Sequence, residues 1–242
     1  MEKQEFEAVF CKIFEKNGLN RFCKPDIIEK FRLFTDIFLE ANAAFNLTAI
    51  KEIPDVIAKH YADCLLAEEL FPIGASVMDI GCGGGFPTFP LAIARPDLSI
   101  TAVDSTQKKI SFVAETAKQL GLSSITALCA RAEAEELRPY REGYDVVTSR
   151  AMARMTVLSE LAVPFVKIGG KLVALKGALG AEEQKEAERA LKILGIGDSN
   201  AIRATLKTEV GEETRYFLIA TKQKPTPAQY PRQYAAIIKK PL

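Results

Sequence analysis

The chain has 242 residues, of which 48% are hydrophobic and 26% charged, and its formal net charge is +1. This composition is that of an ordinary globular protein, so it excludes a disordered chain and gives no overall charge excess that would favour nucleic acid. No apolar run approaches the roughly 20 residues of a membrane-spanning helix. Residues 1–7 are acidic and lack the basic region of a signal peptide.

The number and spacing of the cysteine and histidine residues indicate the redox compartment and whether a metal site is present. The five cysteines are scattered without a Cys-x-x-Cys pair, and the chain has one histidine, His60. An odd number of scattered thiols indicates a reducing compartment, so a cytoplasmic protein is expected. No metal site is expected, because the sequence offers neither clustered thiols nor a second histidine.

Residues 1–74 are predicted to form a helical N-terminal extension. Pro25 can occupy the first turn of a helix, and the apolar residues after it share one face because of their spacing. These residues are Ile27, Phe31, Phe34, Phe38 and Ala41. Pro54 is predicted to begin another helix, with Tyr61 on its inward face. Since no flexible linker follows, we expect the extension to pack on a domain formed by residues 75–242.

From residue 76 onward, short β-prone runs alternate with amphipathic helical patterns. Strands are predicted at 76–80, 99–103, 124–129, 144–148 and 171–175, and helices at 89–95, 108–120, 155–166 and 181–194. Two further β-prone runs, 202–210 and 215–221, have no helix between them and can pair as a hairpin. The acidic residues of the last helix, Glu183 among them, are predicted to form a solvated face.

This alternation predicts an α/β fold of the Rossmann-like kind. The sheet is expected to be doubly wound, seven-stranded and mostly parallel, with the closing hairpin placing one antiparallel strand near the edge. Ligands of such sheets bind beyond the carboxyl ends of the strands. The site is therefore expected at residues 79–86, 104, 130–133, 149–150 and 176.

A glycine-rich loop follows the first of these strands. In order it reads Asp79-x-Gly81-x-Gly83-x-Gly85-Phe86. The glycines permit positive φ and let backbone amides approach a ligand, and Asp104 ends the next strand, where nucleotide sites place an acid against ribose hydroxyls. The glycine order differs from the dinucleotide fingerprint, and the acid before the first glycine suits a ligand with an amino group, such as S-adenosylmethionine. The alternative is a glycine-rich turn without a ligand.

The C-terminal segment is locally basic. After residue 220 the chain has five basic residues and no acid: Lys222, Lys224, Arg232, Lys239 and Lys240. Such a segment can contact phosphate, so this tail is a candidate site of nucleic-acid contact.

Several short segments together resemble one protein family. They are residues 45–50, Lys59-His60 with Asp63, 83–87, 103–105 with 108–110, 131–133, 150–153, 176–177, 230–232 and 240–242. With the glycine loop they make the chain similar to class I S-adenosylmethionine-dependent methyltransferases and, more closely, to the GidB/RsmG family of guanine-N7 methyltransferases acting on small-subunit (16S) ribosomal RNA. The resemblance implies S-adenosylmethionine as cofactor, small-subunit ribosomal RNA or the ribosomal subunit as partner, and no membrane association. A monomer is expected.

The resemblance also assigns roles to residues. The positions that match the family's cofactor contacts are Gly81, Phe86, Ala132, Glu133 and Arg150, and the expected cofactor site adds Asp79, Gly83, Gly85 and Asp104. Glu133 can alternatively be a surface acid and Phe86 a core ring. Thr88 stands where the family usually has a glycine, so its bulk is expected to alter the mouth of the methionine pocket.

Arg150, His60, Lys176 and the segment 46–48 each have more than one interpretation. The planar guanidinium of Arg150 can donate hydrogen bonds to guanine O6, to a phosphate or to the cofactor carboxylate. Alternatively, it forms a structural salt bridge. His60 and Asp63 share a helix face, where His60 either positions the substrate or is simply packed. Lys176 either contacts phosphate or is a solvated cation. Residues 46–48 end a helix by turn chemistry or line a guanine pocket.

The predicted reaction is in-line transfer of methyl to N7 of a specific guanine in 16S ribosomal RNA. Guanine N7 carries a lone pair and no proton, so the enzyme needs alignment and no general base. In agreement, Thr148-Ser149-Arg150-Ala151 stands where exocyclic-amine methyltransferases carry an Asp/Asn-Pro-Pro-aromatic motif. The alternatives are a small-molecule methyltransferase and a non-catalytic, cofactor-binding ribosome-assembly or regulatory protein.

Overall fold

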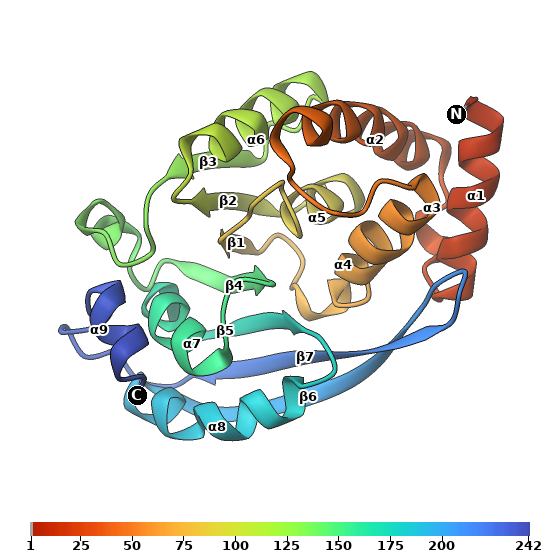
Figure 1. Ribbon diagram of the computed structural model, residues 1–242. Helices are drawn as coiled ribbons and strands as arrows, with labels where there is room; N and C mark the ends of the chain where they lie inside the picture. The colour runs from red at the N-terminus through yellow and green to blue at the C-terminus, as the bar shows by residue number, and fades with distance from the viewer. Residues whose placement is uncertain (1) are drawn as a thin grey trace.

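A seven-stranded sheet with helices on both faces forms the centre of the molecule (Figure 1). The computed structural model describes residues 2–242, apart from the side chain of Phe45; Met1, the first residue of the predicted extension, lies outside the described residues. The strands are β1 (Ser76–Ile80), β2 (Ser99–Asp104), β3 (Ile125–Cys129), β4 (Tyr144–Arg150), β5 (Val166–Lys176), β6 (Ile196–Lys207) and β7 (Glu212–Lys222). Their spatial order is β3-β2-β1-β4-β5-β7-β6.

The direction of the strands confirms the predicted sheet. Strands β1 to β5 pair in parallel, whereas β7 is antiparallel to both of its neighbours, β5 and β6. The predicted hairpin therefore exists and places one antiparallel strand next to the sheet edge. The switch point of the sheet lies at β1 and β4, whose carboxyl ends are the expected place for a ligand.

The helices cover the two faces separately. They are α1 (Lys3–Lys16), α2 (Pro25–Phe45), α3 (Ile53–Val56), α4 (Asp63–Leu65), α5 (Thr88–Ala94), α6 (Gln107–Gln119), α7 (Met155–Ala162), α8 (Gly180–Ile193) and α9 (Tyr234–Lys239). A π-helical segment, η2 (Ile57–Ala62), joins α3 to α4. Pro164 interrupts the helix over 155–166, as its sequence predicts: α7 ends at Ala162, and a 3-10 turn over Val163–Phe165 follows.

Side-chain alternation along the strands produces two hydrophobic cores. Val77 of β1 and Val146 of β4 belong to the core that α1, α2, α5 and α6 cover, whereas Met78 and Val147 belong to the core under α7, α8 and α9. This is the expected period of two residues for a sheet that is buried on both faces. Among residues 2–242, no helix combines the length and the apolarity needed to cross a membrane.

Aromatic rings join the N-terminal helices to the sheet domain. Phe34 of α2 lies 4.5 Å from Phe89 of α5 between ring centroids, and Phe31 lies 4.8 Å from Tyr61. The Tyr61 hydroxyl is 2.8 Å from the hydroxyl of Thr35, so this buried phenol keeps a hydrogen-bond partner. The helices before residue 75 thus share one continuous core with the sheet.

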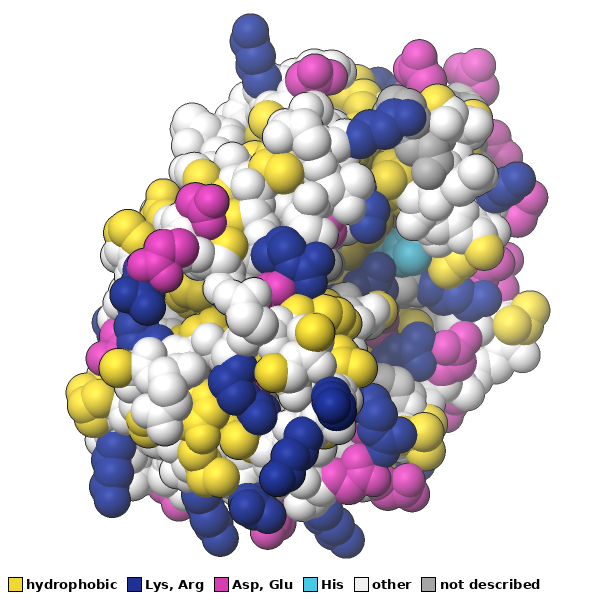
Figure 2. All heavy atoms as spheres, turned by 60° about the vertical axis from the view of Figure 1, so that its left-hand side comes forward, with side chains coloured by type: hydrophobic (Ala, Val, Ile, Leu, Met, Phe, Trp, Pro, Cys, Tyr) yellow, Lys and Arg dark blue, Asp and Glu magenta, His cyan; other side chains and the backbone are white. Residues whose placement is uncertain are grey.

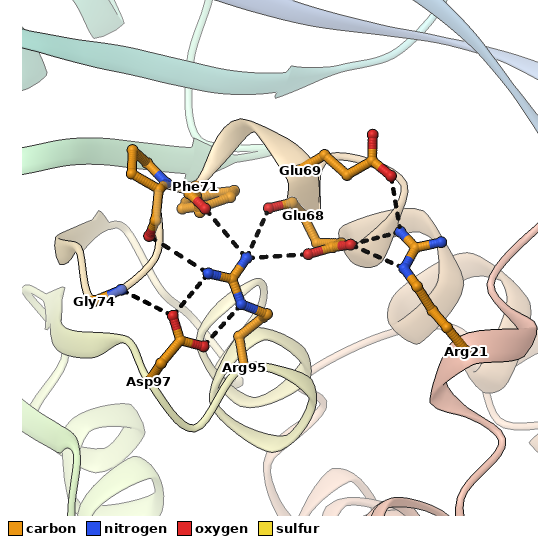
Figure 3. A network of polar contacts seen from close by, with 8 residues as sticks. Arg21, Glu68, Glu69, Phe71, Gly74, Arg95 and Asp97 are labelled. Carbon is orange, nitrogen blue, oxygen red and sulfur yellow. Dashed lines mark hydrogen bonds and ion pairs between the residues drawn. The ribbon is translucent and has the colours of Figure 1, made fainter.

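A polar network fastens the same helices at a second place (Figure 3). The buried carboxylate of Glu68 accepts from Arg21 on one side and, over 3.1 Å, from Arg95 on the other. Arg95 in turn donates two hydrogen bonds, of 2.8 and 2.7 Å, to the carboxylate of Asp97 in a bidentate ion pair. Asp97 also accepts from the backbone amide of Gly74. The network connects the segment after α1 with the end of α5.

The β6–β7 hairpin reaches across to α1 (Figure 1). The side-chain amide of Asn17, directly after α1, donates to the carbonyl of Lys207 over 2.9 Å and accepts from its amide over 2.8 Å. Asn17 therefore acts as a strand partner for the last residue of β6, 190 positions away in the sequence.

Candidate active site

Three adjoining cavities lie at the carboxyl ends of the central strands. The loop cavity, about 520 Å³, is lined by the glycine loop, Thr48, His60, Asp104 and Arg150. The edge cavity, about 210 Å³, continues from it along Asp104 to Ala132 and Glu133. The arginine cavity, about 660 Å³, opens on the other side of Arg150 toward Arg215. Most residues that the sequence predicted for the site thus lie on one continuous depression, as expected at the switch point of the sheet.

The glycine loop has the backbone that its sequence predicts. Gly81, Gly83 and Gly85 have φ angles of +74°, +56° and +89°, which side chains with a Cβ rarely adopt. A Cβ on Gly85 would lie 2.2 Å from the ring of Phe89, and one on Gly81 would lie 3.0 Å from Cγ of Met152. The loop therefore needs glycine both for its conformation and for its packing.

Asp104 fixes this loop from the neighbouring strand. Its Oδ2 accepts from the amide of Gly83 over 3.1 Å, and its Oδ1 accepts from the amide of Thr106 over 2.9 Å. Lys109 lies 3.7 Å from the same carboxylate. A carboxylate has about four lone-pair positions, so Asp104 keeps acceptor capacity on the wall shared by the loop and edge cavities.

Asp79 lies beneath the loop, on no cavity wall. Its carboxyl group is fully buried and its Oδ2 accepts from the Thr88 hydroxyl over 2.6 Å, while Oδ1 has no hydrogen-bond partner among residues 2–242. Burial raises the pKa of Asp79 to about 7. The expectation that Thr88 alters the mouth of a pocket is wrong, because Thr88 is itself fully buried and points its hydroxyl at Asp79.

The far end of the edge cavity is closed by the C-terminal helix. Ala132 and Glu133 line it as predicted, and Glu133 is bonded to Arg131 over 2.6 Å. The Arg131 guanidinium lies over the ring of Tyr234, 5.1 Å from the centroid, and Tyr234 of α9 is also part of the wall. No sequence pattern pointed to Tyr234, since α9 adjoins the cavity only through the tertiary fold.

Phe86 and His60 form a stacked pair at the base of the loop cavity. Their ring centroids are 4.6 Å apart with planes 23° from parallel, and the Arg150 guanidinium lies 5.2 Å from the centre of Phe86. Phe38 meets Phe86 edge-on at 5.1 Å. Phe86 is therefore a core ring that also forms part of the cavity wall.

Arg150 is held by the protein itself. Its Nη1 donates to the carbonyl of Lys59 over 3.0 Å and to Asp63 over 3.1 Å, and its Nη2 donates to His60 Nδ1 over 2.9 Å. Asp63 also accepts from Arg215 over 2.6 Å. The structural salt bridge considered for Arg150 is thus present, and it joins β4 and β7 to the helices η2 and α4.

His60 is neutral with a defined tautomer. Arginine only donates, so Nδ1 must accept from Arg150 and the ring proton must sit on Nε2, which lies 3.1 Å from the Thr48 hydroxyl. Burial and the positive charge of Arg150 lower the pKa of His60 to about 3. Both ring nitrogens are thereby occupied within the protein.

Three basic side chains that were expected to contact phosphate or solvent are paired with acidic side chains of the protein itself. Lys176, predicted to contact phosphate or solvent, is buried and bonded to Glu183 over 2.9 Å and to the Ala153 carbonyl, so Glu183 is not part of a purely solvated face. Lys222 is fully buried against Glu142, and Arg232 pairs with the fully buried Glu160. Of the basic tail, Lys224, Lys239 and Lys240 remain exposed.

Met152 is a site residue that the sequence reasoning missed. It lines all three cavities and packs on Gly81, in a segment where Ala151 has a φ of +54°. Its place in the segment 150–153, which resembles the family, was the available signal. Residues 46–48 end α2 by turn chemistry, with Asn46 in the left-handed conformation, and Thr48 also lines the loop cavity.

The space-filling view shows the depression from its open side (Figure 2). The only histidine, coloured cyan, lies in the hollow, and lysine and arginine side chains gather around it and below it. Within the described part of the chain, no group of three histidine, cysteine or acidic side chains is arranged to hold a metal ion.

Comparison with known proteins finds a family model and relatives that carry the same description. Residues 27–209 match the family GidB, described as rRNA small subunit methyltransferase G. The protein named ribosomal RNA small subunit methyltransferase G of Ligilactobacillus salivarius is 41% identical over 231 residues, which cover 93% of this chain and 94% of that protein. Its namesake in Lysinibacillus sphaericus is 40% identical over 240 residues, covering 98% and 99%.

Solved structures share the fold at low identity. The cofactor-bound Rv0187 from MTB superposes with a TM-score of 0.54 and 19% identity, covering 79% of this chain and 90% of that one. The precorrin-6y C5,15-methyltransferase of Geobacter metallireducens gives a TM-score of 0.50 and 18% identity, covering 74% and 92%. These likenesses support the predicted methyltransferase fold.

Proposed function

This chain belongs to the GidB family, the rRNA small subunit methyltransferase G proteins, and on that premise we propose that it transfers methyl from S-adenosylmethionine to N7 of one guanine in 16S ribosomal RNA. The site is built at the switch point of the sheet, where such folds bind nucleosides. Five free thiols support a place in the reducing cytoplasm.

The cavities fit S-adenosylmethionine. The cofactor supplies a methyl group on a positively charged sulfur. Asp104 would bind the ribose hydroxyls with its remaining lone pairs, and Ala132 and Glu133 would line the adenine end. Gly81 and Gly83, with Phe86, would form the wall of the methionine end. Asp79 lies on none of the three cavity walls and accepts from Thr88, so it would support the glycine loop from below and not contact the cofactor.

The observation that carries the N7 assignment is that the loop cavity is lined by one carboxylate, Asp104, which is assigned to the ribose, and by no imidazole that is free to take a proton. His60 is held neutral with both nitrogens bonded, and Arg150 and Lys109 are cations. Exocyclic amines lose a proton on methylation, whereas N7 has none to lose. A site that only aligns its substrate is sufficient for N7, and alignment can lower the barrier by several kcal/mol, up to about 7–11.

Basic side chains at the mouth support an RNA substrate. The arginine cavity is lined by Lys59, Arg150, Arg154 and Arg215, and Arg154 is largely exposed. Lysine and arginine around the hollow can position phosphates while the base enters it (Figure 2). A free small metabolite would gain little from this rim.

The test is incubation with radiolabelled S-adenosylmethionine and small-subunit RNA or subunits from cells lacking the protein, followed by nucleoside analysis. Label in N7-methylguanosine is expected. Label in another nucleoside would refute the N7 assignment, and label in a small metabolite would favour the metabolite enzyme. Binding of the cofactor without transfer to RNA or subunits would favour the non-catalytic alternative.

A further inference from the structure

We propose that the Thr48 hydroxyl donates a hydrogen bond to O6 of the target guanine and that this bond selects guanine over adenine. The inference rests on the proposed function, and it adds a specificity-determining residue to the site. It follows from the hydrogen-bond directions along a chain of three side chains: Arg150, His60 and Thr48.

The direction of this chain is fixed at its buried end. Arg150 is a donor only, and its anchors at Asp63 and the Lys59 carbonyl leave Nη2 directed at His60 Nδ1. The neutral ring therefore carries its proton on Nε2 and donates it to Thr48 Oγ1 over 3.1 Å. The stacked Phe86 ring keeps the imidazole plane in place.

Thr48 consequently accepts twice. Besides the imidazole, the amide of Ile50 donates to the same hydroxyl oxygen over 3.1 Å. A hydroxyl oxygen has two lone pairs, so both are used, and the remaining function of the group is its O–H donor. None of the hydrogen bonds among residues 2–242 uses that proton.

The hydroxyl is also rigidly placed on the cavity wall. The Thr48 amide donates to the side-chain oxygen of the buried Asn42 over 2.8 Å, which ties the residue to α2. Thr48 is half-buried and lines the loop cavity together with Gly81 and Asp104. An acceptor entering the cavity would thus meet a preorganised donor.

The two purines differ at the position next to N7. Guanine presents the acceptor O6 there, whereas adenine presents the donor N6 amine. An ordinary threonine hydroxyl could serve either base, because it both donates and accepts. With its lone pairs occupied, Thr48 can serve only guanine, and an adenine amine would face a donor without an acceptor.

The test combines two Thr48 variants with two RNAs. Thr48→Val removes the hydroxyl at nearly constant shape, and Thr48→Ser retains it. The RNAs carry either guanine or 2-aminopurine, which has N7 but lacks O6, at the position located by the nucleoside assay. For each pair of enzyme and RNA we would measure kcat/KM for methyl transfer. The Kd for the cofactor and the Tm of each variant show whether the substitution has disturbed the glycine loop or the fold.

Wild type and Thr48→Ser should prefer guanine by about tenfold or more, and Thr48→Val should lose about tenfold of that preference with an unchanged cofactor Kd. Full preference in Thr48→Val would overturn the proposal. So would a weakened cofactor Kd with unchanged preference, because the hydroxyl would then bind the cofactor carboxylate. Absence of any methylated RNA from wild type is a different result, which refutes the proposed function itself.

Discussion

Replacing Asp79 by asparagine should remove a pH dependence of stability. The carboxyl is fully buried, has one partner in Thr88, and has its pKa raised by burial from 3.8 to about 7. A raised pKa means that the folded state holds the proton more tightly than the unfolded chain. The stabilisation is therefore complete below pH 3.8 and is lost as the pH rises through about 7.

The magnitude follows from the size of this change. One pKa unit corresponds to about 1.4 kcal/mol, so the ionised carboxylate costs the fold about 4 kcal/mol above pH 7. Between pH 5 and pH 8, wild type should lose about 2 to 3 kcal/mol of unfolding free energy through this group. The amide introduced by Asp79→Asn would keep an acceptor for Thr88 and carry no charge, so this variant should lack the loss.

Urea unfolding at pH 5 and pH 8 measures both proteins. Asp145→Asn is the control, because bonds from Lys167 and Ser76 lower the pKa of Asp145 to about 2, so its contribution is constant over this range. The control should be less stable than wild type at both pH values but keep the wild-type slope. Equal slopes for wild type and Asp79→Asn would show that Asp79 is ionised in the fold, and the reasoning would be refuted.

Three further outcomes are expected. Glu68→Ala should lower the unfolding free energy by about 3 to 5 kcal/mol, because two arginines lose their buried partner. The control Glu69→Ala removes an exposed carboxylate and should change it by less than about 0.5 kcal/mol, so similar losses in both variants would show that the buried network does not stabilise the fold. Asp104→Ala should weaken S-adenosylmethionine binding in calorimetry by about 1 to 3 kcal/mol, and an unchanged Kd would argue against a ribose contact. Reversing the charges of Lys239 and Lys240 should flatten the salt dependence of RNA binding, and an unaltered slope would remove the tail from the interface.

The sequence was sufficient for the number of strands, their mostly parallel direction and the helix faces where hydrophobic periodicity was strong. It predicted too late a start for the strands β5 and β6. β5 begins at Val166 and not at 171, because Gly169 and Gly170 interrupt the apolar run although the backbone continues in the sheet. β6 begins at Ile196 and not at 202: its turn-forming residues 198–200 pair with β7, and only Gly197 is left out, at a shift of register. Ladder pairing outweighs local propensity at such positions.

At the candidate site, the sequence located the residues but not their partners. The loop, Asp104 and Glu133 follow strand ends, so topology alone placed them together. The hydrogen-bond acceptors of Arg150 come from a helical segment about 90 positions earlier, and the local spacing of residues does not predict a contact over that distance. The same holds for Thr88 and Asp79, since only the packed loop shows that the two side chains meet in the interior.

The bond between Asn17 and Lys207 bears on the order in which the chain folds during synthesis. Helices α1 and α2 leave the ribosome first, but the surfaces that complete their core include Leu206 and Phe217. The part of this core that Leu206 and Phe217 cover stays exposed until the last hairpin is made, which leaves apolar surface open to aggregation during translation. A chaperone that shelters the first helices would therefore raise the yield of folded protein more than one that acts on the finished chain.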